Sequence, residues 1–209
     1  MDDIFLTMKR FAGLFRQGTT LPVTILLPLL VVALAWPLLL VWLNDESATF
    51  MAAFVLAMGL RLALRSGGTI RKMRSQISNR LTVILALLFG PGVLAVLIWS
   101  GEPIWCQRFL SVYFLVMAGL YLLDVIDGRH AMVQYFLPAD RNRGTDALMT
   151  RVMAIFQMAL LLLNETMIAT APLTVWLVYF GLLPILSHRV LIALVRTVDE
   201  AYAAGYGRL

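Results

Sequence analysis

The sequence predicts an all-α membrane protein: a polytopic bundle of six transmembrane helices preceded by an N-terminal amphipathic helix on the membrane surface. The chain has 209 residues, of which 61% are hydrophobic and 14% charged, and its mean hydropathy is +0.85. Soluble domains carry about 45–50% apolar residues, and a domain of this size still exposes much of its area. This much apolar surface cannot be buried in one small core, so the surrounding solvent must be lipid.

Residues 1–18 are expected to form the interfacial helix. Ile4, Phe5, Met8, Phe11 and Phe15 recur at helical spacing, while polar and basic residues occupy the rest of the wheel. The basic residues and the apolar run that follows could also indicate a signal peptide. Because that run stays apolar through residue 43, we expect an uncleaved anchor instead.

Six spans follow from stretches that lack acidic and basic residues. Residues 17–44, 81–101 and 166–188 reach the roughly 20 residues that a spanning helix needs. Three shorter stretches reach that length if Arg61, Asp124 and Arg151 at their ends extend toward the headgroups. The spans are predicted at about 22–43, 48–65, 81–100, 109–126, 148–167 and 173–195, within a transmembrane domain of residues 19–209.

The basic residues give an independent test, because Lys and Arg are retained on the cytoplasmic side of short loops. With six spans and an inside N-terminus, all of the 17 Lys and Arg residues except Arg108 are cytoplasmic. Arg (15) also far outnumbers Lys (2), which is typical of a GC-rich bacterial genome. We therefore expect a bacterial inner-membrane protein with both termini in the cytoplasm.

Composition argues against most cofactor and enzyme classes. Two His and one Cys leave almost no ligands for haem, structural zinc or an iron–sulfur cluster, so no cofactor or metal is expected. No G-x-S-x-G element or glycine-rich phosphate loop occurs. The net charge of +5 lies in short segments between apolar runs, which favours anionic phospholipids over nucleic acid as the partner.

Ionisable residues inside a membrane are candidates for function, and several lie near the inner ends of spans two, four, five and six. If their faces converge, they form a cytoplasm-facing polar vestibule in which the aspartates oppose the arginines. If each side chain extends separately to the headgroups, there is no vestibule. The residues are Arg61, Asp124, Asp127, Arg151, His188 and Arg189.

Two further groups are candidates. If the fifth helix continues to about residue 170, Asn164 and Glu165 lie inside the bilayer and form a proton or cation site, with Asn164 and Thr166 as oxygen ligands. If it ends near Leu163, Glu165 is a loop residue. The basic loop between spans two and three is expected to bind a partner protein or lipid headgroups through Arg71, Lys72, Arg74 and Arg80.

The segment from Asp124 to Ala131 resembles the first half of the motif of the CDP-alcohol phosphotransferases, through Asp124, Asp127, Gly128 and Ala131. Members of that family hold two metals with four acids, and the resemblance implies a membrane enzyme acting on lipid headgroups. Here Met132 and Arg141 replace an Arg and a Gly of the motif, and Thr145 and Met149 replace its last two acids. Without those acids the metal pair cannot be built.

The leading hypothesis is a non-enzymatic multi-pass inner-membrane subunit or accessory factor of a larger envelope assembly, such as a secretion, conjugation or transport machine. It would dock through lateral helix faces and the basic cytoplasmic loop, onto other membrane subunits or onto itself as an oligomer. The alternatives are a small oligomeric channel or transporter that uses the polar vestibule, and a membrane lipid-headgroup enzyme.

Overall fold

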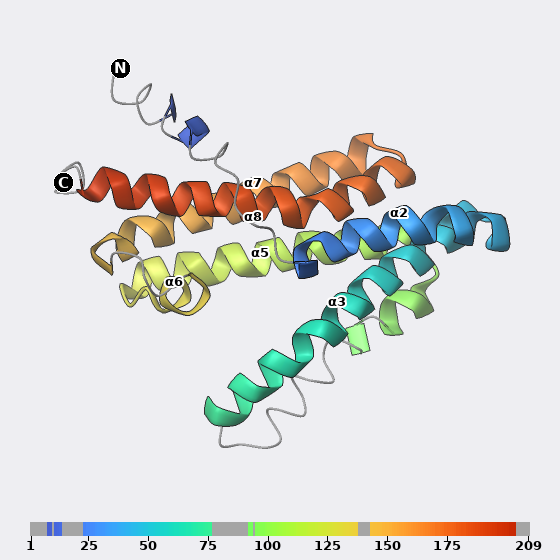
Figure 1. Ribbon diagram of the computed structural model, residues 1–209, viewed down its shortest axis with the longest axis horizontal. Helices are drawn as coiled ribbons and strands as arrows, with labels where there is room; N and C mark the ends of the chain where they lie inside the picture. Colours follow the sequence, from blue (N-terminus) through green and yellow to red (C-terminus); the bar gives the residue numbers. More distant parts are fainter. Residues whose placement is uncertain are drawn as a thin grey trace. The chain divides into compact units, whose positions relative to one another are not determined.

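The computed structural model describes residues 8–9, 11–13, 23–76, 92–93, 95–137 and 143–203. It is 93% helical, with no strand in the described part of the chain. This confirms the predicted all-α class. The elements, shown in Figure 1, are α2 (Val23–Leu43), α3 (Glu46–Gln76), α5 (Pro103–Asp127), α6 (Ala131–Phe136), the 3-10 turn η1 (Arg143–Thr145), α7 (Asp146–Thr170) and α8 (Leu173–Ala203).

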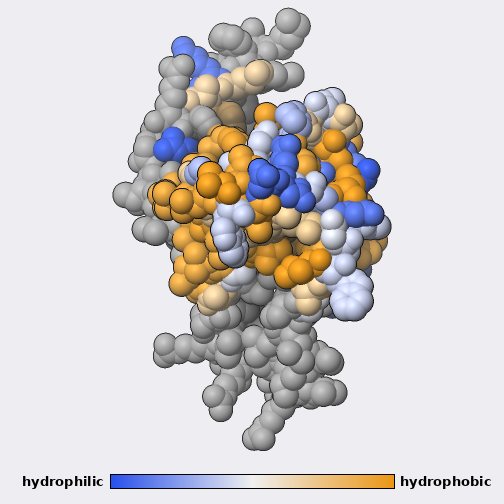
Figure 2. All heavy atoms as spheres, turned by 90° about the vertical axis from the view of Figure 1, so that its right-hand side faces the viewer, coloured by the Kyte–Doolittle hydropathy of each residue, from blue (hydrophilic) through white to orange (hydrophobic). Residues whose placement is uncertain are grey.

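Four of these helices, α2, α5, α7 and α8, are long and apolar enough to cross a membrane. They match the predicted spans at 22–43, 109–126, 148–167 and 173–195. Large apolar side chains point outward from them; Leu38, Val41 and Ile126 are 72%, 86% and 79% exposed, and hydrophobic atoms cover much of the face in Figure 2. Water-soluble monomers rarely expose extensive apolar surface, so this is a membrane protein.

In three places the observed helices extend beyond the predicted spans. α5 begins at Pro103 rather than at residue 109, and α3 and α8 continue to Gln76 and Ala203. At these three places the predicted span stopped at or next to a charged residue, Arg108, Arg65 or Arg196, but backbone hydrogen bonding can continue beyond the hydrocarbon. Pro is well suited to the first position of α5, since the first N–H groups of a helix have no partner within it.

The count of six spans is not confirmed. α3 covers the second predicted span, 48–65, but it is not among the four helices identified as candidate spans. Most of the third predicted span, 81–100, lies outside the described residues, which include a helical stretch at 95–100. Of the predicted interfacial helix, only residues 8–9 and 11–13 are described, and these are helical.

The chain divides into two compact units, each assembled from distant parts of the sequence. Unit 1 contains Met1–Thr20, Phe109–Met167 and Leu186–Leu209, and unit 2 contains Leu21–Arg108 and Ile168–Ile185. In unit 1 the α5, α7 and α8 segments lie side by side (Figure 1). Their buried core includes Tyr121, Met149, Met153 and Val195, together with Val133 from α6.

Unit 2 has an aromatic core. Phe50 and Phe54 of α3 pack against Trp176 and Phe180 of α8, with ring centroids 5.6 Å apart for Phe50 and Trp176 and 4.9 Å apart for Phe54 and Phe180. All four side chains are at most 2% exposed. Each such pair contributes about 0.5–1.5 kcal/mol beyond the burial of its area, so this cluster joins α3 to the first half of α8.

α2 also packs closely against α8 in unit 2, at Gly181. A Cβ atom at this position would lie 3.1 Å from the Cα atom of Leu29, so the two backbones approach each other closely only because Gly181 has no side chain. The neighbouring Pro28 is fully buried. Gly181 therefore determines how near α2 and α8 can come.

Replacing Gly181 with Ala should lower the free energy of unfolding by about 1–3 kcal/mol. The new Cβ would be closer to the Leu29 backbone than the roughly 3.5–4.0 Å of a favourable carbon contact, so α2 and α8 would have to separate. Thermal or SDS-induced unfolding in detergent measures the change.

Gly119→Ala on α5 is the matched control, because a Cβ there meets nothing within 4 Å. Ala favours a helix by about 1 kcal/mol over Gly, so this variant should be at least as stable as the original protein. Equal losses for the two variants would contradict the close helix contact.

Candidate functional site

The buried carboxylate of Asp124 closes the turn between α5 and α6. Gly128 and His130 both have positive φ angles, 67° and 53°, and together they reverse the chain after α5. His130 precedes α6 but provides no side-chain cap. Instead, the two carboxylate oxygens of Asp124 accept hydrogen bonds from the backbone N–H groups of Ala131 and Met132, each at 2.9 Å. A carboxylate at the start of a helix also interacts favourably with the helix dipole.

A second set of hydrogen bonds attaches this turn to α7. Gln134 Nε2 donates to Asp146 Oδ2 at 3.0 Å, and the Thr150 hydroxyl donates to the Asp146 carbonyl oxygen at 2.8 Å. The Thr150 oxygen also lies 3.1 Å from His130 Nδ1. Because Thr150 has already donated its one hydroxyl proton, His130 must donate through Nδ1–H. This contact holds His130 in the left-handed conformation, which costs roughly 1–2 kcal/mol for a residue other than Gly.

The start of α7 is in turn joined to the end of α8. Thr145, only 1% exposed, donates its hydroxyl proton to Asp199 Oδ1 at 3.0 Å. The Tyr202 side chain lies directly over Gly144, where a Cβ atom would come within 2.7 Å of the phenolic oxygen. Together these groups form what we call the α5–α8 polar network, whose members are Asp124, His130, Gln134, Thr145, Asp146, Thr150 and Asp199.

Only one residue of the predicted vestibule, Asp124, belongs to this network. Asp127 and Arg151 are exposed, and His188 and Arg189 are half-buried on α8. Arg61 belongs to unit 2, and the other five residues belong to unit 1. The other network members were missed by sequence reasoning, although the helix-reversing Gly128 and the spacing of Asp146 and Thr150 by four residues were visible signals. No three His, Cys, Asp or Glu side chains of the described residues are placed to hold a metal ion.

Asn164 and Glu165 lie within α7, six and five residues before its end at Thr170, in a helix long and apolar enough to span the membrane. The side chain of Asn164 is fully buried, and its Nδ2 donates to Ser111 Oγ of α5 at 2.8 Å. Ser111 in turn donates to Glu165 Oε1 at 2.5 Å. These three side chains form what we call the Ser111–Asn164–Glu165 cluster.

This cluster differs from the predicted ligand set in one member. Thr166 is exposed and donates to the carbonyl oxygen of Leu162 in its own helix. Ser111, which replaces it, lies 53 residues from Asn164 in the sequence. The only available signal was a polar residue inside the otherwise apolar stretch 109–123, and nothing in the sequence pairs it with α7.

The buried face of α7 carries a third polar side chain, Gln157, midway between Thr150 and Asn164. The three residues are seven apart, so they lie on one side of the helix. Gln157 is 8% exposed, and its Oε1 has no hydrogen-bond partner among the described residues. Polar side chains thus occur along most of the inward face of α7.

The residues predicted to dock a partner or headgroups belong to unit 2. α3 continues as a helix through Arg71, Lys72 and Arg74, which therefore occupy its last turns. Arg80 lies outside the described residues.

Comparisons with models of protein families, with curated proteins and with solved structures found no match. Function is therefore inferred from the chain's own geometry.

Asp124→Ala should destabilise the protein by about 1–3 kcal/mol, because it leaves the N–H groups of Ala131 and Met132 without their buried acceptor. Asp127→Ala is the control, since Asp127 is an exposed Asp one turn further along the same helix. Thermal unfolding in detergent should show a lower midpoint only for Asp124→Ala. If the two variants unfold alike, Asp124 does not support the turn.

Proposed function

We propose that the protein is a non-enzymatic, multi-pass inner-membrane subunit or accessory factor of a larger envelope assembly, and that it docks through the basic end of α3. The observation that carries this proposal is the length of α3. At 31 residues and 1.5 Å per residue it is about 46 Å long, whereas the hydrocarbon core is about 30 Å thick. If its first part crosses the membrane, the remainder projects beyond it as a basic helix. We call this projecting end of α3, which includes Arg71, Lys72 and Arg74, the basic arm.

Two observations support a membrane-spanning first half of α3. Only Asn44 and Asp45 connect α2 to α3, so the chain turns back at once and α3 packs against α2. Phe54 of α3 lies against Phe180 of α8, which is itself a candidate span. A helix that packs against two membrane spans lies, like them, in the hydrocarbon of the bilayer.

If α3 and residues 81–100 both cross the membrane, the chain has six spans and both termini lie in the cytoplasm. Omitting both crossings would leave the later helices in the same orientation, but it would place the basic residues of α3 outside. The retention of Lys and Arg on the cytoplasmic side favours six spans over four.

The contacts of the ionisable residues favour a structural over a catalytic use of the interior. Both oxygens of Asp124 hold backbone N–H groups, Asp146 accepts from Gln134, and Asp199 accepts from Thr145. Acids engaged in this way brace the helix ends against one another. The surfaces that remain for function are the exposed helix faces and the basic arm, which suit protein partners, an oligomer of this chain, or anionic phospholipids.

The topology can be tested with single cysteines in a Cys106→Ala background, which removes the only native Cys. Ser75→Cys, near the end of α3, should react with a membrane-impermeant maleimide only after the inner membrane is opened. Ser47→Cys, at the start of α3, is the control and should react from the outside in intact spheroplasts. Reaction of Ser75→Cys from the outside would indicate four spans and reject a cytoplasmic arm.

Docking is tested by changing Arg71, Lys72 and Arg74 together to Glu. Reversing three charges at a contact opposes association with an acidic partner, so proteins that copurify from native membranes should fall at least tenfold in quantitative mass spectrometry. Arg129→Glu with Arg151→Glu is the control, because both side chains are exposed outside the arm. Unchanged copurification after the triple change would reject docking through α3; loss of anionic phospholipid alone would assign the arm to headgroups.

A second candidate function, a small oligomeric channel or transporter for protons or cations, is favoured by the Ser111–Asn164–Glu165 cluster. Glu165 lies about 7.5 Å from the end of α7 at 1.5 Å per residue, and ionisable groups within spans often mark ion pathways. If the protein conducts protons through this cluster, Glu165→Gln should abolish proton flux in liposomes. Glu102→Gln, an exposed change before α5, should leave it unaltered. Flux that survives Glu165→Gln would remove the cluster from any pathway.

A further inference from the structure

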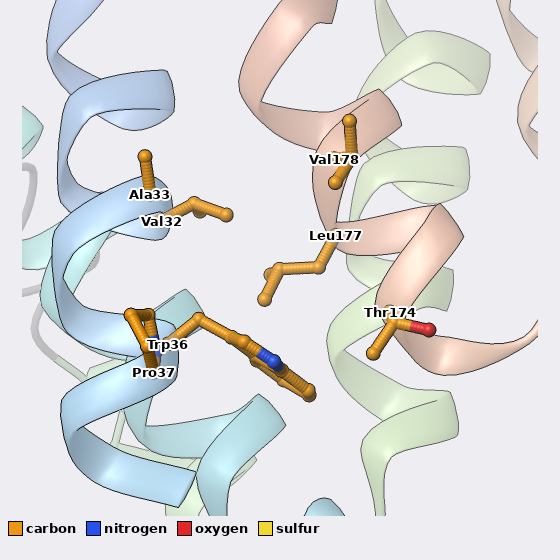
Figure 3. Close-up of a pocket in the computed structure, with 7 residues that line it drawn as sticks. All are labelled: Val32, Ala33, Trp36, Pro37, Thr174, Leu177 and Val178. Atoms are coloured by element: carbon orange, nitrogen blue, oxygen red, sulfur yellow. The ribbon is translucent and has the colours of Figure 1, made fainter.

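The contact between α5 and α7 in unit 1 holds an ionisable side chain within a helix that can span the membrane. Glu165 lies about 7.5 Å from the end of α7 at 1.5 Å per residue, and it belongs to the Ser111–Asn164–Glu165 cluster. The space between α2 and α8 in unit 2 differs, because no ionisable side chain is among those that line it in Figure 3. Ionisable groups inside spans mark proton relays and ion pathways, so the cluster is the stronger candidate for binding a charged species.

The hydrogen bonds of the cluster form a chain that ends on the carboxylate. Asn164 Nδ2 donates to Ser111 Oγ at 2.8 Å, and the Ser111 hydroxyl donates to Glu165 Oε1 at 2.5 Å. An amide nitrogen only donates and a hydroxyl has a single proton, so both donors point toward Glu165. The groups that surround this carboxylate oxygen therefore present hydrogen atoms to it, and not further oxygen lone pairs.

A metal cation does not fit this arrangement of donors. Calcium takes about six to eight oxygen ligands, and magnesium requires a nearly ideal octahedron of them. The cluster supplies one carboxylate, and the described residues contain no group of three His, Cys, Asp or Glu side chains that could hold a metal ion. A cation at Glu165 Oε1 and Ser111 Oγ would also have to displace the two hydrogen bonds between α5 and α7.

A proton fits the same groups, because it needs only one carboxylate oxygen and the chain of hydrogen bonds can reverse. When Glu165 is protonated, its O–H can donate to Ser111 Oγ, and the Ser111 hydroxyl can donate to Asn164 Oδ1 once the amide has turned over. Hydroxyl and amide groups both donate and accept, so each protonation state of Glu165 keeps two hydrogen bonds within the cluster. Proton uptake then requires no movement of α5 relative to α7.

We propose that Glu165 is a reversible binding site for protons and not for metal cations, and that Ser111 and Asn164 adapt their hydrogen bonds to its two protonation states. Proton binding here rests on the second candidate function and narrows its cargo from protons or cations to protons alone. The nearest charged residue on α5 is Arg108, one turn before Ser111, and an Arg side chain is not deprotonated in proteins. No acidic or basic residue occurs at 109–123, 152–164 or 166–187, so the pH dependence belongs to Glu165.

Dicyclohexylcarbodiimide tests proton binding directly, because this apolar reagent enters the bilayer and reacts with protonated carboxyl groups. The carboxyl oxygen bonds to the central carbon of the reagent and the proton moves to a nitrogen; rearrangement then leaves an N-acylurea. The protein in liposomes, with Cys106→Ala to remove its only thiol, should carry one adduct on Glu165 by mass spectrometry. Labelling should fall about tenfold for each pH unit above its midpoint. Glu165→Gln should lose the adduct and Glu102→Gln, the control, should keep it.

Metal cations and two variants complete the test. At constant pH and ionic strength, sodium, magnesium and calcium should leave the labelling rate unchanged, and protection by any of them would overturn the selectivity for protons. Asn164→Leu removes one end of the hydrogen-bond chain and should displace the midpoint by about one pH unit. Thr166→Val is the matched control, since Thr166 is exposed and bonded within its own helix; an unchanged midpoint in Asn164→Leu would overturn the role of the chain.

Labelling and transport are separate measurements. An adduct on Glu165 without proton flux in liposomes would support the proton site and reject the channel or transporter. No adduct on Glu165 at any pH would overturn the proton site, whether or not the liposomes conduct protons.

Discussion

Hydrocarbon offers no hydrogen-bond partners, and this constraint explains most of the polar contacts in the protein. Backbone groups satisfy one another within helices, so the described chain is almost entirely helical. Where a helix ends, some other group has to serve: at the turn after α5 this is the carboxylate of Asp124, which accepts from two N–H groups at once. The hydroxyl of Thr150 and the ring of His130 continue this arrangement into α7.

The two units meet the constraint in different ways. Unit 1 contains many ionisable and hydroxyl side chains, and they bind one another across α5, α6, α7 and α8. Unit 2 has an aromatic core centred on Trp176, which packs without needing polar partners. A polar network fixes one relative position of its helices, because a shift of about one ångström breaks its hydrogen bonds.

Four of the six predicted spans coincide with helices long enough and apolar enough to cross a membrane, whereas the contacts between helices were predicted poorly. The first predicted span, 22–43, and α2 differ by one residue, and Asn164 and Glu165 lie on a helix that reaches Thr170, one of the two possibilities considered. Asp124 was predicted to lie near the inner end of a span and to oppose arginines if the helix faces converged; its observed partners are backbone N–H groups seven and eight residues later. Ser111 was not identified at all, since its partner Asn164 lies on another helix.

Hydropathy adds up residue by residue, so the sequence alone determined that this chain is helical and where four of its helices are long and apolar enough to cross a membrane. Each residue makes that contribution whatever its neighbours are. The close approach at Gly181 and the pairing of Ser111 with Glu165 depend on the register between helices far apart in the chain. Only the tertiary structure decided these, because a shift of one residue along either helix would turn each of those side chains to another face.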